Sequence, residues 1–149
     1  MRHMGYFAAR DLIKTKLIDE AAKVGVNVRV LPAAGWKQAL ASLQPVPGIF
    51  IWHQADKVPT GNAATRDNGR RQVVDQVWSV VVGVKNVADV AGAAAQDDAE
   101  PLVNIVQTLQ GWKPSAEHGH CYRIQSPFTS AYVNGFGVYP FAFQTRIFT

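Results

Sequence analysis

Cysteine, charge and long apolar runs are all scarce in this sequence. Cys121 is the only cysteine among 149 residues, so the fold cannot depend on an internal disulfide or on a zinc site made of cysteines. Charged residues make up only 17% of the chain, which leaves more neutral surface for contact with partners and favours an oligomer. No run reaches the roughly 18 apolar residues of a membrane span, and the start of the chain lacks the apolar stretch of a secretory signal. We therefore expect no membrane contact, and a protein kept in the cytoplasm or in a particle assembled there.

The motifs of common catalytic sites are also missing. The sequence contains no P-loop, no glycine-rich dinucleotide fingerprint, no serine nucleophile elbow and no zinc-protease motif. Asp97, Asp98 and Glu100 could supply the paired carboxylates of a catalytic site, but adjacent helical residues point in different directions and do not converge on a substrate. We interpret these three residues as solvated helix charge, and we predict no enzyme activity and no cofactor.

One short pattern could hold a metal ion. His118 and His120 stand two residues apart, so in an extended chain both imidazoles point the same way, and Cys121 follows directly. The stretch is rich in proline and glycine, and no third ligand is anchored near it. We therefore favour a solvated loop for the two histidines and a structural role for Cys121 at the start of a strand. A small metal-binding enzyme remains the alternative.

The basic residues form one dense group, Arg66, Arg70 and Arg71. The net charge of +4, from 15 basic and 11 acidic residues, is modest for a nucleic-acid-binding protein. Three arginines in a polar segment are more typical of a protein contact or a solvated face than of DNA recognition. We predict that these arginines bind a partner, and the sequence leaves open whether that partner is protein or DNA.

Hydrophobic periodicity predicts the order of helices and strands. Apolar residues at spacings of three and four predict helices, which we place at residues 6–24, 36–43 and 88–109. Alternating or continuous apolar runs predict strands, which we place at residues 26–31, 48–53, 70–85, 121–124 and 138–148. Because neighbouring strands follow one another without long helices between them, we expect an α+β fold. It would be one domain, residues 1–149, with a mixed, mainly antiparallel sheet packed against two long helices and one short helix.

Two segments depart from this regular pattern. Residues 54–69 have few large apolar residues and contain Pro59, two glycines and two asparagines, so they predict a loop longer than the ~12–15 residues at which loops are usually functional or disordered. The strand predicted at residues 70–85 is long for an ordinary sheet. We therefore expect its first part, at about residues 70–76, to project as an arm. Pro101 predicts a kink or a second helix start, and Pro140 predicts an edge or the start of a strand.

Several stretches resemble one known family. They are the strand QVWSVVVGV at residues 76–84 with the alanine-rich helix after it, LQGWKP at residues 109–114, and the strand YPFAFQT at residues 139–145. Together with the amphipathic first helix, this order resembles the phage tail terminator, or tail-completion, proteins over most of the chain. None of these stretches is specific by itself.

The resemblance implies a structural role in the virion, with no catalytic residue to carry over. Such proteins form a homo-oligomeric ring, usually a hexamer, that caps the tail tube, stops its polymerisation and joins the tail to the head-completion proteins of the neck. Assembly takes place in the host cytoplasm, and DNA meets the ring only by passing through its lumen. A head-completion or connector protein of the same neck is the alternative. We expect residues 54–69 and the strand start to reach a neighbouring subunit or the tube, with Arg66, Arg70 and Arg71 as polar contacts.

Overall fold

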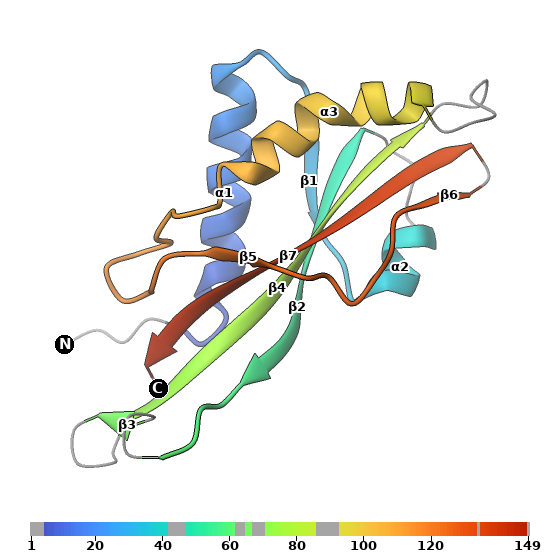
Figure 1. The fold of residues 1–149 in the computed structure, drawn as a ribbon. Coiled ribbons are helices and arrows are strands. Elements are labelled where there is room, and N and C mark those ends of the chain that lie inside the picture. The colour runs from blue at the N-terminus through green and yellow to red at the C-terminus, as the bar shows by residue number, and fades with distance from the viewer. Residues whose placement is uncertain are drawn as a thin grey trace.

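The computed structural model describes residues 5–41, 47–61, 65–66, 71–85, 93–133 and 135–148 (Figure 1). Within these ranges the chain is α+β, with a mixed sheet and three helices, as predicted. The helices are α1 (Ala8–Lys23), α2 (Trp36–Ala41) and α3 (Ala93–Gln107). The strands are β1 (Arg29–Pro32), β2 (Gly48–Lys57), β3 (Thr65–Arg66), β4 (Arg71–Lys85), β5 (Tyr122–Ile124), β6 (Ala131–Val133) and β7 (Phe136–Phe148). None of the described helices is long and apolar enough to span a membrane.

The sheet is built around the two longest strands, β4 and β7. They pair antiparallel from Val73 opposite Phe148 to Lys85 opposite Phe136. The strand order is β1-β2-β4-β7-β5, while β3 pairs with β4 and β6 pairs with β7. Only the β1–β2 pair is parallel among the described strands, and α2 lies in the connection between these two strands. A parallel pair needs such a crossover, whereas the antiparallel pairs do not.

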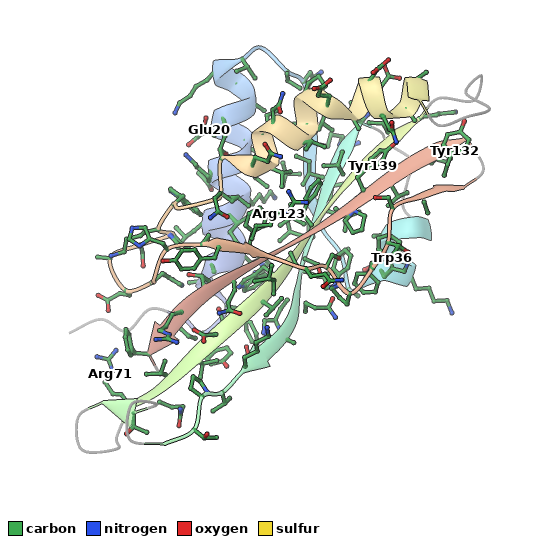
Figure 2. The ribbon with its side chains drawn as sticks, viewed as in Figure 1. Glu20, Trp36, Arg71, Arg123, Tyr132 and Tyr139 are labelled. Carbon is green, nitrogen blue, oxygen red and sulfur yellow. The ribbon has the colours of Figure 1, made fainter. Side chains whose placement is uncertain are left out.

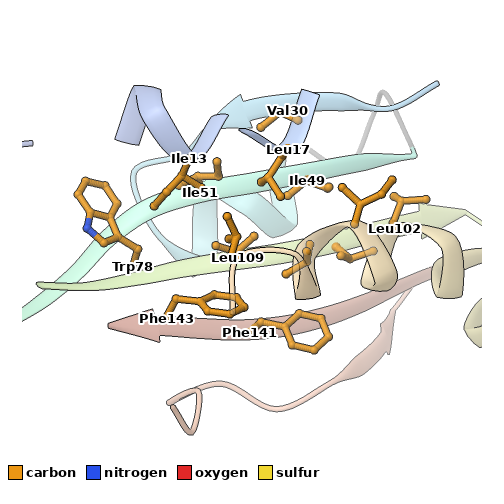
Figure 3. Packing of buried hydrophobic residues seen from close by; sticks show 14 of the residues in the cluster. Ile13, Leu17, Val30, Ile49, Ile51, Trp78, Leu102, Leu109, Phe141 and Phe143 are labelled. Carbon is orange, nitrogen blue, oxygen red and sulfur yellow. The ribbon is translucent and has the colours of Figure 1, made fainter. Parts of the chain in front are cut away.

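The helices cover the two faces of the sheet, and β2 shows the division. Ile49 and Ile51 pack into one cluster with residues of α1 and α3 (Figure 3). Phe50 and Trp52 point the other way, into a cluster with Ala39 of α2. The continuous apolar run therefore belongs to a strand covered on both faces, because successive side chains of a strand alternate between the faces of the sheet.

Helix α1 buries one narrow stripe against the sheet. Its buried residues, Ala9, Ile13, Leu17 and Ala21, recur at intervals of four, which places them on one side of the helix. Val24, predicted to continue this stripe, is instead 65% exposed, because the helix ends at Lys23 and the chain turns at Gly25. The left-handed φ of +70° at Gly25 explains why a glycine follows the helix there.

Helix α3 continues through Pro101 without a break. The proline lies inside the Ala93–Gln107 helix, so it does not mark a second helix start. Because proline has no backbone N–H, the carbonyl of Asp97 lacks the hydrogen bond that an ordinary helix would give it. The first part of the predicted helix falls partly on residues 86–92, which lie outside the described residues.

The long loop predicted at residues 54–69 is wrong at its beginning. β2 continues to Lys57, with a register shift between His53 and Ala55, and its last residues pair with β4. Thr65 and Arg66 form a further short strand. The apolar run predicts that the strand ends at His53. The polar residues after it also form strand, because polar residues pair when a neighbouring strand offers its backbone groups.

The projecting arm predicted at about residues 70–76 is incorrect for its second half, whereas Arg71 and Gln72 lie beyond the ends of β2 and β7 and pair only with β3. Asp75 and Gln76 pair with β2 on one side and with β7 on the other, so they lie inside the sheet. The length of β4 is explained by β7, which has 13 residues and accompanies it almost from end to end. Arg70 lies outside the described residues.

Pro140 occupies a local edge of the sheet, as predicted. It pairs with Val81 of β4 on one side of β7. On the other side, β6 pairs with Phe136–Val138 and β5 with Ala142–Gln144, so Pro140 falls between these two short strands. A residue without a backbone N–H is tolerated there because that position requires no ladder hydrogen bond.

Candidate assembly surface

The structure brings two of the three predicted partner-binding arginines into register. Arg66 in β3 is the Cα partner of Arg71 in β4. The Arg71 guanidinium lies 5.5 Å from the centre of the Phe148 ring, at the end of β7 (Figure 2). We call β3 and the start of β4 the arginine hairpin. Its two arginines are therefore carried by paired strands, although sequence reasoning assigned Arg66 to a loop.

An ion pair holds the strands together next to the arginine hairpin. Arg146 of β7 donates two hydrogen bonds to the carboxylate of Asp75, at 2.8 and 3.1 Å. The two residues are also opposite one another in the β4–β7 register. These hydrogen bonds raise the pKa of the Arg146 guanidinium. Bidentate pairs of this kind fix geometry, so the arginine hairpin extends from a firmly paired part of the sheet.

The turn before α1 is fastened to the same end of the sheet. The Tyr6 hydroxyl donates to Asp56 Oδ2 at 2.6 Å, and His53 Nε2 lies 2.7 Å from Asp56 Oδ1. Gln76 Nε2 donates to the Tyr6 carbonyl at 2.8 Å, and the Phe7 ring packs edge-on against His53. Sequence reasoning missed this cluster because Asp56 was assigned to a loop.

Burial and the neighbouring carboxylate change the acidity of this cluster. Desolvation, followed by the hydrogen bond to Asp56, raises the pKa of Tyr6 to about 12. Desolvation also acts to raise the pKa of Asp56, but the hydrogen bonds from Tyr6 and His53 outweigh it and leave that pKa below its ordinary value. At neutral pH, Tyr6 is therefore a hydrogen-bond donor and Asp56 a charged acceptor.

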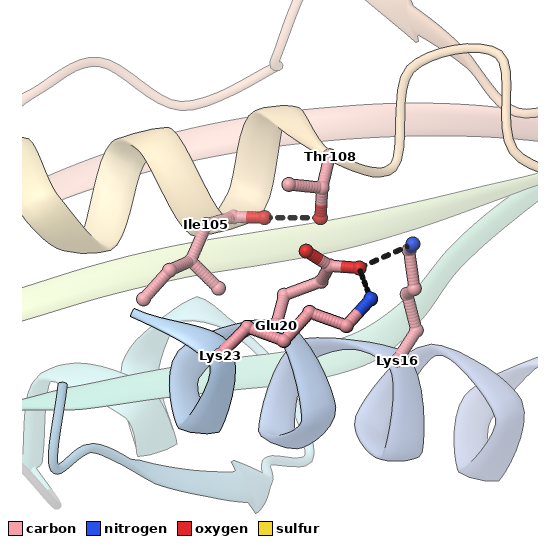
Figure 4. Close-up of polar contacts among 5 residues, drawn as sticks. All are labelled: Lys16, Glu20, Lys23, Ile105 and Thr108. Atoms are coloured by element: carbon pink, nitrogen blue, oxygen red, sulfur yellow. Dashed lines mark hydrogen bonds and ion pairs between the residues drawn. The ribbon is translucent and has the colours of Figure 1, made fainter. Parts of the chain in front are cut away.

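A second surface feature is a groove of about 490 Å³ between the C-terminal part of α1 and α3. Three carboxylates line it, those of Glu20, Asp97 and Glu100. Glu20 accepts hydrogen bonds from Lys16 at 2.8 Å and Lys23 at 3.0 Å, which lower its pKa (Figure 4). We call this feature the acidic groove. The sequence predicts only solvated charge for the acidic residues of α3, because no local pattern shows that α1 lies beside them and forms the other wall of the groove.

The possible metal pattern is divided between the interior and the surface. His118 is only 4% exposed, its Nδ1 lies 2.7 Å from Ser115 Oγ, and burial lowers its pKa. The solvated-loop prediction is therefore wrong for His118, while His120 is exposed as expected. Cys121 is fully buried, and burial raises the pKa of its thiol to about 12, which suits the structural role predicted for it. Within the described ranges, no three His, Cys, Asp or Glu residues gather as a metal site would require.

Comparison with known protein families gives a match that covers nearly the whole chain. The model of a family described as phage tail terminator protein matches residues 4–149, which include every helix and strand described above. A search of curated proteins found no match.

Proposed function

We propose that this chain, which belongs to the phage tail terminator protein family, forms a homo-oligomeric ring that caps the tail tube. The ring is a hexamer that stops polymerisation of the tube and joins the tail to the head-completion proteins of the neck. It assembles in the host cytoplasm and remains in the virion, where DNA passes through its lumen. The observation that carries this proposal is the family match over residues 4–149, which supports a structural role in a phage tail.

Two physical features support a role in assembly. A cyclic ring needs two different, complementary surfaces on each subunit. The arginine hairpin and the acidic groove differ in charge and come from different elements of the fold. Only 17% of the residues are charged, which leaves neutral surface available for the remaining contact area.

Electron microscopy of the purified protein, alone and with tail tubes, tests the proposal. We expect closed rings, and tubes that stop growing once they carry a ring at one end. Isolated heads incubated with the protein provide the matched comparison, because a head-completion protein would complete heads and leave tubes uncapped. Tubes that keep growing in the presence of the protein would contradict the proposed function.

Deletion of residues 58–68 tests the part assigned to the arginine hairpin. The deletion removes β3 but keeps Lys57, which is opposite Asp75 in the register, so the shortened connection still joins paired strands. We expect a folded monomer that forms no rings and does not join tails. Circular dichroism and light scattering measure the fold and the mass, and unchanged assembly would show that the hairpin is not a contact.

A further inference from the structure

Two hollows of opposite charge adjoin along one edge of the sheet, where β5 and β6 pair with β7 (Figure 1). The first, of about 490 Å³, is lined by residues that include Arg123 and Thr129, and we call it the basic hollow. The second, of about 410 Å³, is lined by residues that include Glu100 and Ser130, and we call it the α3 hollow. Because Thr129 and Ser130 are consecutive, the two hollows meet there. One surface therefore carries both signs of charge next to each other.

Arg123 is held in the basic hollow without a counter-ion. Its backbone N–H donates to Gln110 Oε1 at 2.7 Å, and its guanidinium lies 4.7 Å from the centre of the Phe141 ring. The ring attracts and orders the guanidinium, but an uncharged ring does not neutralise it. No carboxylate forms an ion pair with Arg123 in the part of the chain that the structure describes. Since the planar fork of a guanidinium binds carboxylates in pairs, the basic hollow suits a carboxylate ligand.

The carboxylates of Asp97 and Glu100 have the opposite requirement. Both residues are exposed, line the α3 hollow, and are three positions apart, which puts them on one side of the helix. Within the described ranges, neither side chain has an ion-pair or hydrogen-bond partner. The α3 hollow therefore suits a cation.

Apolar side chains lie between the two charged sites. Val103 and Tyr139 line the α3 hollow, while Phe128 and Phe141 line the basic hollow. A partner that brought charges to both hollows would also cover these side chains. Partner surfaces of this kind combine aromatic contact area with a few charged groups.

We propose that this surface pairs two copies of the chain about a two-fold axis, with Arg123 of each copy against Asp97 and Glu100 of the other. A two-fold contact is reciprocal, so a surface that carries a cation beside carboxylates meets its own complement when it is rotated onto itself. The charges that a partner needs here are the ones that the chain itself carries. A second copy is therefore the occupant that the charges of the two hollows specify.

The pair is a contact of a different kind from those of the proposed ring. A two-fold contact closes on two subunits, whereas a cyclic ring uses two different surfaces of each subunit. Asp97 and Glu100 also line the acidic groove, so a paired subunit cannot offer that groove to a neighbour in a ring. In this respect the inference rests on the proposed function, because pairing competes with ring formation. A subunit that cannot pair should form rings at a lower concentration.

Engineered cysteines test the two-fold axis directly. Ser130 and Thr129 lie where the hollows meet, so the axis brings each of them close to its own copy. Ring contacts join different surfaces and do not bring a residue against itself. We expect oxidation of Ser130→Cys or Thr129→Cys to give disulfide-linked dimers on a non-reducing gel. Cys121 is fully buried and should not react, and Ala116→Cys is the matched control, because Ala116 is exposed but lines neither hollow.

Charge reversals in the Ser130→Cys protein test the ion pairs. Arg123→Glu, or Asp97→Lys with Glu100→Lys, places like charges at both ends of the contact, so we expect the cross-linked fraction to fall about tenfold or more. An equimolar mixture of these two variants restores opposite charges at both ends, so cross-linked heterodimers should return. Lys113→Glu is the matched control, because Lys113 is exposed outside both hollows, and it should leave cross-linking unchanged. Circular dichroism confirms that each variant is folded.

Electron microscopy of dilution series measures the competition, and Arg123→Glu should form rings at a lower concentration than wild-type protein. Absence of dimers in both cysteine variants would overturn the pair. Dimers that persist in both reversed variants, or that the mixture does not restore, would overturn the assigned ion pairs. Rings that need the same or a higher concentration in Arg123→Glu would overturn the competition. All of these outcomes leave the proposed function standing, which is contradicted instead if wild-type protein neither forms rings nor caps tubes.

Discussion

In the described part of the chain, more buried apolar residues lie on one face of the sheet than on the other. On one face, α1 and α3 pack onto β2, β4 and β7, and Ile13, Leu17, Ile49 and Leu109 are completely buried there. On the other face, the described cluster is smaller and depends on the six-residue helix α2. Packing on the first face should therefore contribute most to the free energy of unfolding. Substitutions on the second face should lower that free energy less and disturb the structure only locally.

The contribution of the face that α1 and α3 cover can be tested by truncating a side chain at the centre of its core. Leu17→Ala removes a fully buried side chain, so we expect the free energy of unfolding to fall by about 3 kcal/mol. Urea denaturation followed by circular dichroism measures the change. Ile18→Ala is the matched control, because Ile18 is the next residue on the same helix and is 43% exposed, so its loss should cost about 0.5 kcal/mol or less.

On the face that α2 covers, the corresponding truncation is at the aromatic contact between Phe128 and Trp36. The Phe128 ring stacks on Trp36 with centroids 4.8 Å apart and also meets the edge of Trp52. Because Phe128 is only partly buried, Phe128→Ala should cost about 1–2 kcal/mol, with faster amide exchange confined to α2. Phe128→Leu keeps most of the apolar volume and should recover part of the loss. A cost equal to that of Leu17→Ala would contradict the proposed difference between the faces.

The smallest effect is expected at the turn before α1. Tyr6→Phe removes one hydrogen bond to Asp56 at a site that is 37% exposed, so about 1 kcal/mol or less should be lost. The folded pKa of Tyr6 is raised to about 12 from 10.0, so its contribution is complete below pH 10 and disappears as the pH rises through 12. An ultraviolet titration of wild-type protein should include the late titration of Tyr6.

The Tyr6→Phe variant should lack this late titration. Tyr122→Phe is the control, because Tyr122 is 56% exposed and its removal should leave the late titration in place. If the late titration remained in the Tyr6→Phe variant, the hydrogen bond between Tyr6 and Asp56 would not be the cause.

The sequence alone determined the helices and strands in which apolar residues recur at a regular interval or form a continuous run. The interval of four that joins Ile13, Leu17 and Ala21 is a property of α1 itself, and the apolar run of β2 shows that both of its faces are covered. These patterns persist wherever the element lies in the fold, because burial of a repeating apolar face is what stabilises it. The class of the fold and the family resemblance followed from their order.

The tertiary structure decided the features that depend on contact with a distant part of the same chain. The polar end of β2 is a strand because β4 offers it backbone groups, and β3 and β6 are too short to produce a pattern of their own. The acidic groove exists because α1 and α3 lie side by side, although Glu20 and Glu100 are 80 positions apart in the sequence. Local periodicity carries no information about such distant neighbours. The two surfaces on which ring assembly is proposed to depend could therefore be located only after the chain had folded.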